Sequence, residues 1–478
     1  MMAAASFQFL AFALGVIVVF NVGRSAAWRQ IVLLLASVTF LGFFSLNPLA
    51  WAPLFGFLAF GYLSVRAMQN GNKSGAYALI VLGIVFAFIW LKKYTFLPAP
   101  IFLRFPYLTL GLSYIFFRVL HLVIDARENS LSGKVGLLPY LNYTLNFTTF
   151  VSGPIQRYQD FAEMQQAPLP LNIVVAGEAF ERIVIGFFKV NVLSMLFSSL
   201  QAQALEALSA QQPFEARVLS TVLIAASYPL YLYCNFSGYI DVVIGLARFL
   251  RIRLPENFNR PFSSDNFLNF WSRWHITLSE WLKTYVHNPL LLNLMRRYPS
   301  PALQAFWGVL AIFVTFFLIG VWHGQTSVFV FFGVLQGLGV SVNKLYQILM
   351  AKVLGRKRYK AFANGAIYNV FARGLTFTWF TFTLLWFWSN WTQLSNLANA
   401  SGPAAILAAW AVIFLGSSVI LALWEILRAW LLSWQWGSAP VLHSRYLRTI
   451  RGTALVVIAV STLLLLNAPA PDIVYKAF

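Results

Sequence analysis

Charged residues are scarce in this sequence. Only 10% of its 478 residues are charged, and Asp and Glu together number 14. Hydrophobic residues make up 59% of the chain, and its mean hydropathy is +0.71. A soluble protein of this length needs a more polar surface. The composition therefore excludes a soluble globular domain and indicates a chain that lies in a membrane.

Cysteine is nearly absent as well, since Cys234 is the only one. No disulfide can form within the chain, and no cysteine-based metal cluster is available. The five histidines lie far apart, without the spacing of metal ligands (His121, His275, His287, His323 and His443). We therefore expect no bound metal. The net charge of +20 could suggest nucleic acid, but in a membrane protein it indicates Lys and Arg gathered in cytoplasmic loops, so no nucleic acid is expected.

Long apolar runs are what the sequence has in abundance. Runs of 17–25 residues recur along the chain, each long enough to cross a hydrocarbon core as a helix, whereas barrel strands would alternate in short segments. We predict an all-α polytopic protein of about 11–13 spans, in a single domain over 1–478. No segment resembles a cleavable signal. The expected spans are 5–22, 30–47, 50–66, 76–92, 107–125, 180–200, 216–235, 302–322, 325–347, 370–390, 404–427 and 451–467.

The positions of the basic residues predict an orientation. With the N-terminus outside, the first inner loop contains Arg24 and Arg29, and the basic segment 352–360 also lies inside. The tail at 468–478 then lies outside. Lys92 fits less well, because it opens an outer loop.

Two regions do not resemble simple spans. Residues 139–160 are hydrophobic but broken by Asn, Thr, Gly and Pro, and 236–300 interleaves tryptophans with arginines. Irregular backbone at membrane depth is stable only where it is buried in protein or lines a water-filled cavity. Both regions therefore predict re-entrant or interfacial helices beside a cavity. An acid in such a setting needs a partner, and for Asp241 we expect an arginine such as Arg248.

Three motifs in these regions resemble one family. They are "FSGYIDVVIGLARFLRIRLPENFNRPFSSDNFLNFWSRWHITLSEWL" (236–282), "SGPIQRYQDF" (152–161) and "GVWHG" (320–324). Together they resemble the membrane-bound O-acyltransferases (MBOAT), in the bacterial branch with alginate O-acetylation and teichoic acid D-alanyl transfer proteins. The resemblance covers most of 105–345, in the family's order. It implies helices wrapped around a central tunnel through the membrane.

The resemblance also implies catalytic residues. His323 matches the family's presumed catalytic histidine, and His275 in "RWHITLS" matches the second one of this branch. Many bacterial members have a further histidine where this chain has Gln336, which can still donate and accept hydrogen bonds. The ending "IVYKAF" resembles a tail in which a tyrosine is proposed to relay the acyl group. Tyr475 is therefore a possible relay, and a membrane-interface anchor is the alternative.

Acyl transfer from a thioester to a hydroxyl needs a base, and a neutral imidazole with a pKa near 7 is suited to this. The developing oxyanion needs a donor, for which His275 or a backbone N–H near Gly324 is the candidate. Arg260 could bind a phosphopantetheine phosphate or a lipid headgroup. Trp322 is expected to pack beside His323 and to narrow the tunnel. Trp274 is a weaker candidate for the tunnel wall and fits packing better.

These features together predict an O-acyltransferase of a bacterial inner membrane. It would pass a short acyl group, acetyl or D-alanyl, from a cytoplasmic thioester to an extracytoplasmic partner or polysaccharide. The donor would be acetyl-CoA or the phosphopantetheine of an acyl carrier protein, whose acidic surface suits the basic loops at 250–300 and 344–360. The alternatives are a transporter or flippase and a polyprenyl-linked glycosyltransferase. The sequence shows no clear repeat or paired intramembrane charges for the first, and its outer loops have few acids for the second.

Overall fold

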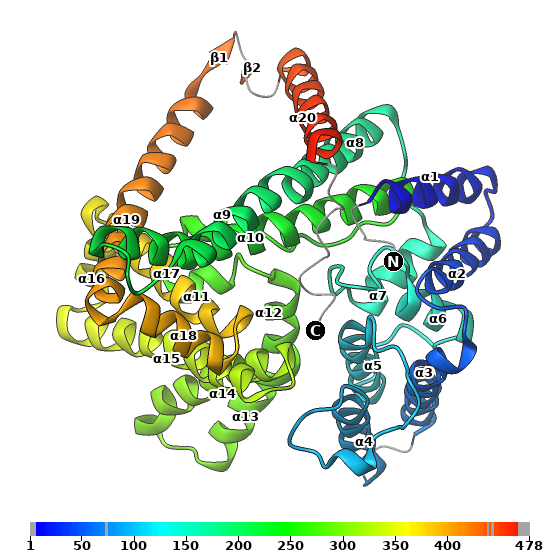
Figure 1. The fold of residues 1–478 in the computed structure, drawn as a ribbon. Helices are drawn as coiled ribbons and strands as arrows, with labels where there is room; N and C mark the ends of the chain where they lie inside the picture. The colour runs from blue at the N-terminus through cyan, green and yellow to red at the C-terminus, as the bar shows by residue number, and fades with distance from the viewer. Residues whose placement is uncertain (1–5, 72–74, 437–438, 441–443, 467–478) are drawn as a thin grey trace. The chain divides into compact units, whose positions relative to one another are not determined.

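The structure, a computed structural model, describes residues 6–71, 75–436, 439–440 and 444–466. Its described part is almost entirely helical, apart from one two-stranded antiparallel pair, β1 (Gln435–Trp436) and β2 (Ala439–Pro440). The chain divides into two compact units (Figure 1). Of the described residues, the first unit contains 6–71, 75–191, 235–256 and 465–466, and the second contains 192–234, 257–436, 439–440 and 444–464. The long helix α10 (Phe214–Phe249) has residues in both units.

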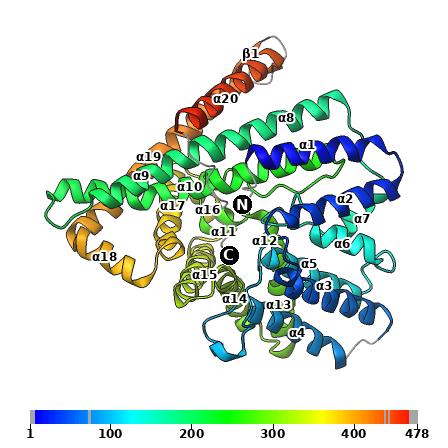
Figure 2. The ribbon, with the colours of Figure 1, turned by 45° about the vertical axis from the view of Figure 1, so that its right-hand side comes forward.

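The first unit contains eight other α-helices and two short helices in its described residues. They are α1 (Phe7–Val22), α2 (Ala26–Gly42), α3 (Pro48–Gln69), α4 (Gly75–Leu91), η1 (Ala99–Ile101), α5 (Leu112–Arg127), α6 (Leu137–Leu145), α7 (Tyr158–Gln166), α8 (Ile173–Phe188) and the π-helical turn η2 (Lys189–Leu193). Side-chain caps start several of them, such as Ser6 for α1 and Asn47 for α3. Helices α3, α4 and α5 pack against one another in this unit (Figures 1 and 2).

A buried arginine holds the broken segment between α6 and α7. Arg118 of α5 is almost completely buried, and its guanidinium donates to the carbonyl oxygens of Tyr143, Thr144 and Thr149 at 2.8–3.0 Å. The carbonyls of Tyr143 and Thr144 lie in the last turn of α6, where a helix leaves carbonyl groups without intrahelical partners. The predicted irregular region at 139–160 is confirmed as a short helix followed by an extended turn.

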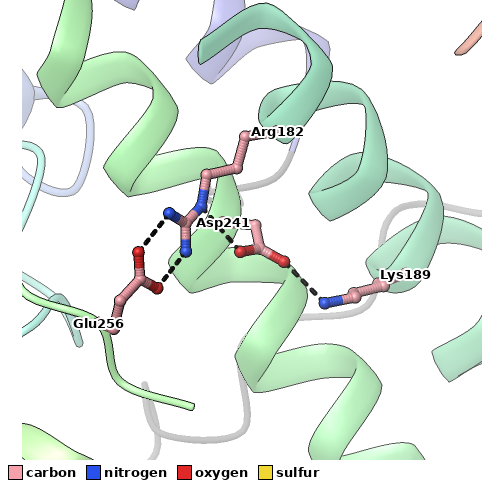
Figure 3. A network of polar contacts seen from close by, with 4 residues as sticks. All are labelled: Arg182, Lys189, Asp241 and Glu256. Carbon is pink, nitrogen blue, oxygen red and sulfur yellow. Dashed lines mark hydrogen bonds and ion pairs between the residues drawn. The ribbon is translucent and has the colours of Figure 1, made fainter. Parts of the chain in front are cut away.

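Four charged residues form one network between α8 and α10 (Figure 3). Asp241 accepts from Arg182 Nε at 3.0 Å and from Lys189 Nζ at 2.7 Å, and Arg182 also forms a two-bond ion pair with Glu256. The expected arginine partner of Asp241 is confirmed, but it is Arg182 and not Arg248. Arg248 lies seven positions further along the same helix, whereas Arg182 and Lys189 reach Asp241 from the chain segment packed against it.

The second unit contains α9 (Ser194–Ala207) and the remaining elements of the chain. These are η3 (Pro261–Ser263), α11 (Phe267–Trp271), α12 (Ile276–Leu282), the π-helical turn η4 (Lys283–His287), α13 (Asn288–Arg297), η5 (Pro301–Leu303), α14 (Gln304–His323), α15 (Ser327–Leu354), α16 (Arg356–Ala363), α17 (Ala366–Trp388), α18 (Trp391–Ser401), α19 (Pro403–Ser433) and α20 (Arg445–Leu466). Helix α15 packs against α14 and against α17, and α17 packs against α19.

The all-helical membrane fold is confirmed. Among the described residues, seven helical segments are long and apolar enough to cross a membrane, and three shorter apolar helices accompany them. Some expected boundaries are wrong. The span expected at 216–235 continues as one helix to Phe249, through Pro229, so the irregular region begins only at 250. The span expected at 107–125 begins at Leu112 and is buried along nearly its whole length.

Candidate active site

The "GVWHG" motif lies at the tip of a tight helical hairpin. Helix α14 ends at His323, and α15 begins at Ser327. Near the tip the two backbones touch, because a Cβ on Gly320 would lie 2.1 Å from the Cα of Gly333. Glycine at both positions allows this approach, as at other close helix contacts in membranes. The hairpin fixes His323 at a helix end that points into the second unit.

His323 lies in an aromatic enclosure and is only 2% exposed. Its ring centroid is 4.8 Å from that of Trp322, 5.0 Å from that of Phe387 on α17 and 6.0 Å from that of Phe332 on α15. Gly324 follows in extended conformation, and the ring of Phe329 lies where a Cβ on Gly324 would project. The motif's two glycines therefore serve packing, and Trp322 lies beside His323 as expected.

His275 is placed by the short helices that precede it. It lies just before α12 with a φ of +44°, a left-handed conformation that is uncommon outside glycine. Its side chain is fully buried, and Nδ1 lies 3.2 Å from Oδ1 of Asn257. The same oxygen accepts from the backbone N–H of Thr277 at 3.1 Å and from its hydroxyl at 2.9 Å.

These contacts define the proton positions on His275. A backbone N–H can only donate, so the Asn257 atom that faces Thr277 is the carbonyl oxygen. His275 Nδ1 must then donate to the same oxygen, which leaves the lone pair on Nε2. Burial lowers the pKa of His275 to about 3, so its ring is neutral at pH 7. In this tautomer, Nε2 of His275 is a proton acceptor.

Trp322 links the two histidines. Its ring centroid lies 6.4 Å from that of His275 and 4.8 Å from that of His323. The structure therefore brings together His275, Trp322 and His323, which the sequence separates by up to 48 positions. Trp274 is nearly fully buried and stacks on Phe270, with ring centroids 5.6 Å apart. It packs the segment beneath His275.

Gln336 and Arg260 have partners of their own. The Gln336 side chain is fully buried one turn beyond Phe332, and its Nε2 donates to Thr383 Oγ1 at 2.8 Å. Arg260 Nη2 contacts both carboxylate oxygens of Glu425 at 2.9 Å, and Ser263 donates to that carboxylate as well. Part of the Arg260 guanidinium is therefore already engaged. Tyr475 lies outside the described residues.

Asn257 is the site residue that sequence reasoning missed. It belongs to the "PENFN" segment of the long motif, and it is fully buried. Nothing in the sequence links it to His275, 18 positions away. The available signal for a role of Asn257 was its amide side chain in the middle of the long motif at 236–282. Among the described residues, no group of three or more His, Cys, Asp or Glu side chains is arranged to bind a metal.

The chain was compared with known protein families and with known proteins. The sequence model of the membrane-bound O-acyltransferase (MBOAT) family matches residues 88–387, well over half of the chain. The chain belongs to this family. The match begins ahead of α5 and ends at Phe387, so it includes His275, Trp322 and His323.

Several similar proteins are named as acyltransferases that act on a polymer. The chain is 27% identical over 294 residues to the teichoic acid D-alanyltransferase of Bacillus subtilis, which covers 60% of this chain and 72% of that protein. It is 27% identical over 325 residues to a probable alginate O-acetylase of Pseudomonas fluorescens, over 66% of this chain and 61% of that protein. It is 40% identical over 120 residues to the peptidoglycan O-acetyltransferase of Helicobacter pylori, over 25% and 21% of the two lengths.

The family, the polytopic membrane fold and the O-acyltransferase activity expected from the sequence are therefore confirmed. The expected bacterial inner membrane location is confirmed as well, because the bacterial relatives of this family lie there. The family assignment does not reach the roles of individual residues, which rest on the geometry described above.

Proposed function

We propose that the chain moves a short acyl group, acetyl or D-alanyl, from a cytoplasmic thioester across the membrane for O-acylation of a cell-surface or exported polysaccharide. The observation that supports this most is the meeting of His275, Trp322 and His323 in one buried site. The relatives' named substrates, teichoic acid, alginate and peptidoglycan, are all polymers of the cell envelope or its exterior.

In this proposal His323 is the base. As an acceptor hydroxyl attacks the thioester carbonyl carbon, His323 takes the hydroxyl proton, and a tetrahedral oxyanion forms. The C–S bond then breaks, the ester remains, and the proton passes to the leaving thiolate. The neutral tautomer of His275 has no proton on Nε2, so it can orient the hydroxyl by accepting a hydrogen bond. The oxyanion donor is therefore assigned to a backbone N–H near Gly324.

The donor in this proposal is acetyl-CoA or an acyl carrier protein that approaches the basic cytoplasmic face. An extracytoplasmic transferase partner completes delivery to the polymer. Tyr475 remains a candidate for the acyl relay, and Arg260 for a donor phosphate contact. Because its Nη2 already contacts Glu425, Arg260 would bind a phosphate through its remaining donors.

One comparison of variants tests this function. Membranes with matched amounts of wild type, His323→Gln and His287→Gln are assayed for acyl groups on the surface polymer. His287 is the control, since it lies on η4 and its Nδ1 lies 3.0 Å from Oδ1 of its neighbour Asn288 in an exposed position. Loss of a general base predicts a fall of roughly 100-fold or more for His323→Gln and a change below about twofold for the control.

Full acylation by His323→Gln would exclude the catalytic role of this histidine. Transport of a lipid-linked molecule, with no acyl ester formed in any variant, would favour the transporter alternative. Mass spectrometry of the ester released from the polymer distinguishes acetyl from D-alanyl.

A further inference from the structure

A large apolar cavity lies in the second unit, and neither His275 nor His323 is among its lining residues. Its volume is about 1350 Å³, and its walls come mainly from α15, α16 and α17, with Phe267 of α11 and Phe414 of α19. Typical small-molecule pockets measure about 300–1,000 Å³. Several lining side chains are exposed, among them Val342, Ile367 and Leu375. The cavity is therefore large enough for hydrocarbon chains, and exposed apolar side chains lie at its opening.

The rim of this cavity is strongly basic. Helix α16, "RKRYKAFA", contributes Ala361 and Phe362 to the lining, and its four basic side chains are exposed beside them. Gly355, with a φ of +78°, turns the chain from α15 into α16. Ring contacts between Tyr346 and Tyr359 hold α16 against α15. The basic residues are Arg356, Lys357, Arg358 and Lys360.

Few acidic residues are available to neutralise these basic side chains. The sequence has no Asp or Glu between Glu280 and Glu425. Among the described residues that line the cavity, Asp265 is the single acid, and its Oδ1 accepts from the amides of Asn266 and Asn269 at 2.9 and 2.6 Å. The rim therefore keeps a clear excess of positive charge.

We propose that this cavity binds an anionic phospholipid, with the acyl chains among the apolar walls and the phosphate on the basic side chains of α16. A basic helix with apolar residues beside it is suited to the interface of an anionic leaflet, where each Lys or Arg is attracted to the negative surface. An acidic carrier protein would match the charges of α16, but it has no group to fill a cavity walled by hydrocarbon. Charge and cavity together therefore favour a lipid.

Native mass spectrometry of the purified full chain tests this site. The protein in non-ionic detergent is titrated with dioleoyl phosphatidylglycerol and, separately, with dioleoyl phosphatidylcholine, which has the same chains but no net charge. The wild type is expected to retain phosphatidylglycerol at least about tenfold more strongly. The triple variant R356Q/K357Q/R358Q should lose most of that preference, because three charges leave an exposed helix whose packing is unchanged.

The matched control is R296Q/R297Q on α13, where two exposed arginines lie on another amphipathic helix that does not line the cavity. This variant should keep the wild-type preference within about twofold. L375W tests the chains separately: a larger ring in the cavity should lower retention of both lipids by a similar factor.

Three results would overturn the proposal. They are equal retention of the two lipids by the wild type, an equal loss of preference in the α13 control, and unchanged lipid binding in both the triple variant and L375W. Binding of an acidic acyl carrier protein that the triple variant abolishes, with lipid retention unaltered, would assign α16 to the carrier instead. None of these readouts depends on acyl transfer.

Discussion

The two histidines of the site differ in how their rings are held. His275 is fixed by a hydrogen bond to Asn257, and Asn257 is fixed in turn by both donors of Thr277. His323 lies instead between aromatic rings from three helices. A ring held by an oriented amide has one tautomer and one direction. We therefore treat Asn257 as a positioning residue that acts through His275.

Replacing Asn257 tests this positioning role. Asn257→Ala removes the oxygen that accepts three hydrogen bonds, so His275 can rotate or change tautomer. By analogy with partners of metal-bound histidines, we expect kcat to fall by about 10–100-fold with a smaller change in KM. Steady-state kinetics on reconstituted protein measures both.

Thr277→Val is the matched control for Asn257→Ala. It removes one donor to Asn257 but leaves the bond to His275. It should therefore change kcat by less than about tenfold. An equal fall in kcat for both variants would indicate general loss of packing rather than a tautomer effect.

Gln336 occupies the position where many bacterial members have a histidine. Its amide donates a hydrogen bond to the hydroxyl of Thr383, and that hydroxyl donates in turn to the carbonyl of Phe380. Gln336→Leu should therefore lower stability by about 1 kcal/mol and leave acyl transfer within about tenfold of wild type. Activity at matched protein levels tests this, and a loss as large as that of His323→Gln would place Gln336 in the chemistry.

At the scale of elements, the α14–α15 hairpin determines where His323 lies. Gly320 meets Gly333, and Gly337 faces the backbone oxygen of Phe313, so a Cβ at any of these positions would collide with the facing helix. Without a second helix packed against α14, no side chain of α15 would hold the His323 ring in place. The close approach brings Phe332 of α15 against it.

A single methyl-bearing side chain at the contact should open this hairpin. Gly320→Val pushes the backbones of α14 and α15 apart and should destabilise the second unit by about 1–3 kcal/mol. Gly308→Val makes the same change on the same helix, where a Cβ meets nothing within 4 Å. Thermal unfolding in detergent should separate the two variants, and similar melting temperatures would contradict the role assigned to this contact.

The short elements between α10 and α14 were only partly predictable. Interleaved tryptophans and arginines indicated a segment that does not span, and the structure has η3, α11, α12, η4 and α13 there. The continuation of α10 to Phe249 was not predictable from hydropathy, because polar residues such as Asn235 and Asp241 interrupt the apolar run. Protein around these residues buries Asn235 and pairs Asp241 with charges on the neighbouring segment.

At the scale of the whole molecule, three of the 14 acids pair with cations that lie on other segments of the chain. Asp241 and Glu256 balance Arg182 and Lys189 (Figure 3), and Glu425 balances Arg260. The acid-free stretch between Glu280 and Glu425 leaves the positive charge of α16 on the surface instead. The excess of +20 is therefore not spread evenly over the molecule.

Asp241 is the centre of the first of these groups. Asp241→Asn would leave Lys189 without its carboxylate and Arg182 with Glu256 alone, and we expect a loss of up to about 3 kcal/mol of stability. Glu256→Gln is the control with a smaller effect, since Glu256 is more exposed. Urea or thermal unfolding in detergent measures both, and an equal loss for the two would contradict the central position of Asp241.

The sequence by itself determined the class of this protein. Composition required a membrane, apolar runs required helices, and three ordered motifs indicated the family and both histidines. These signals are local or linear, so they survive without knowledge of the fold. The tertiary structure decided what depends on distant segments: the partner of Asp241, the amide that orients His275, the glycine contact that places His323, and the apolar cavity beside α16. Each arises where chain segments far apart in sequence pack together, and hydropathy along one segment does not specify which other segment it will meet.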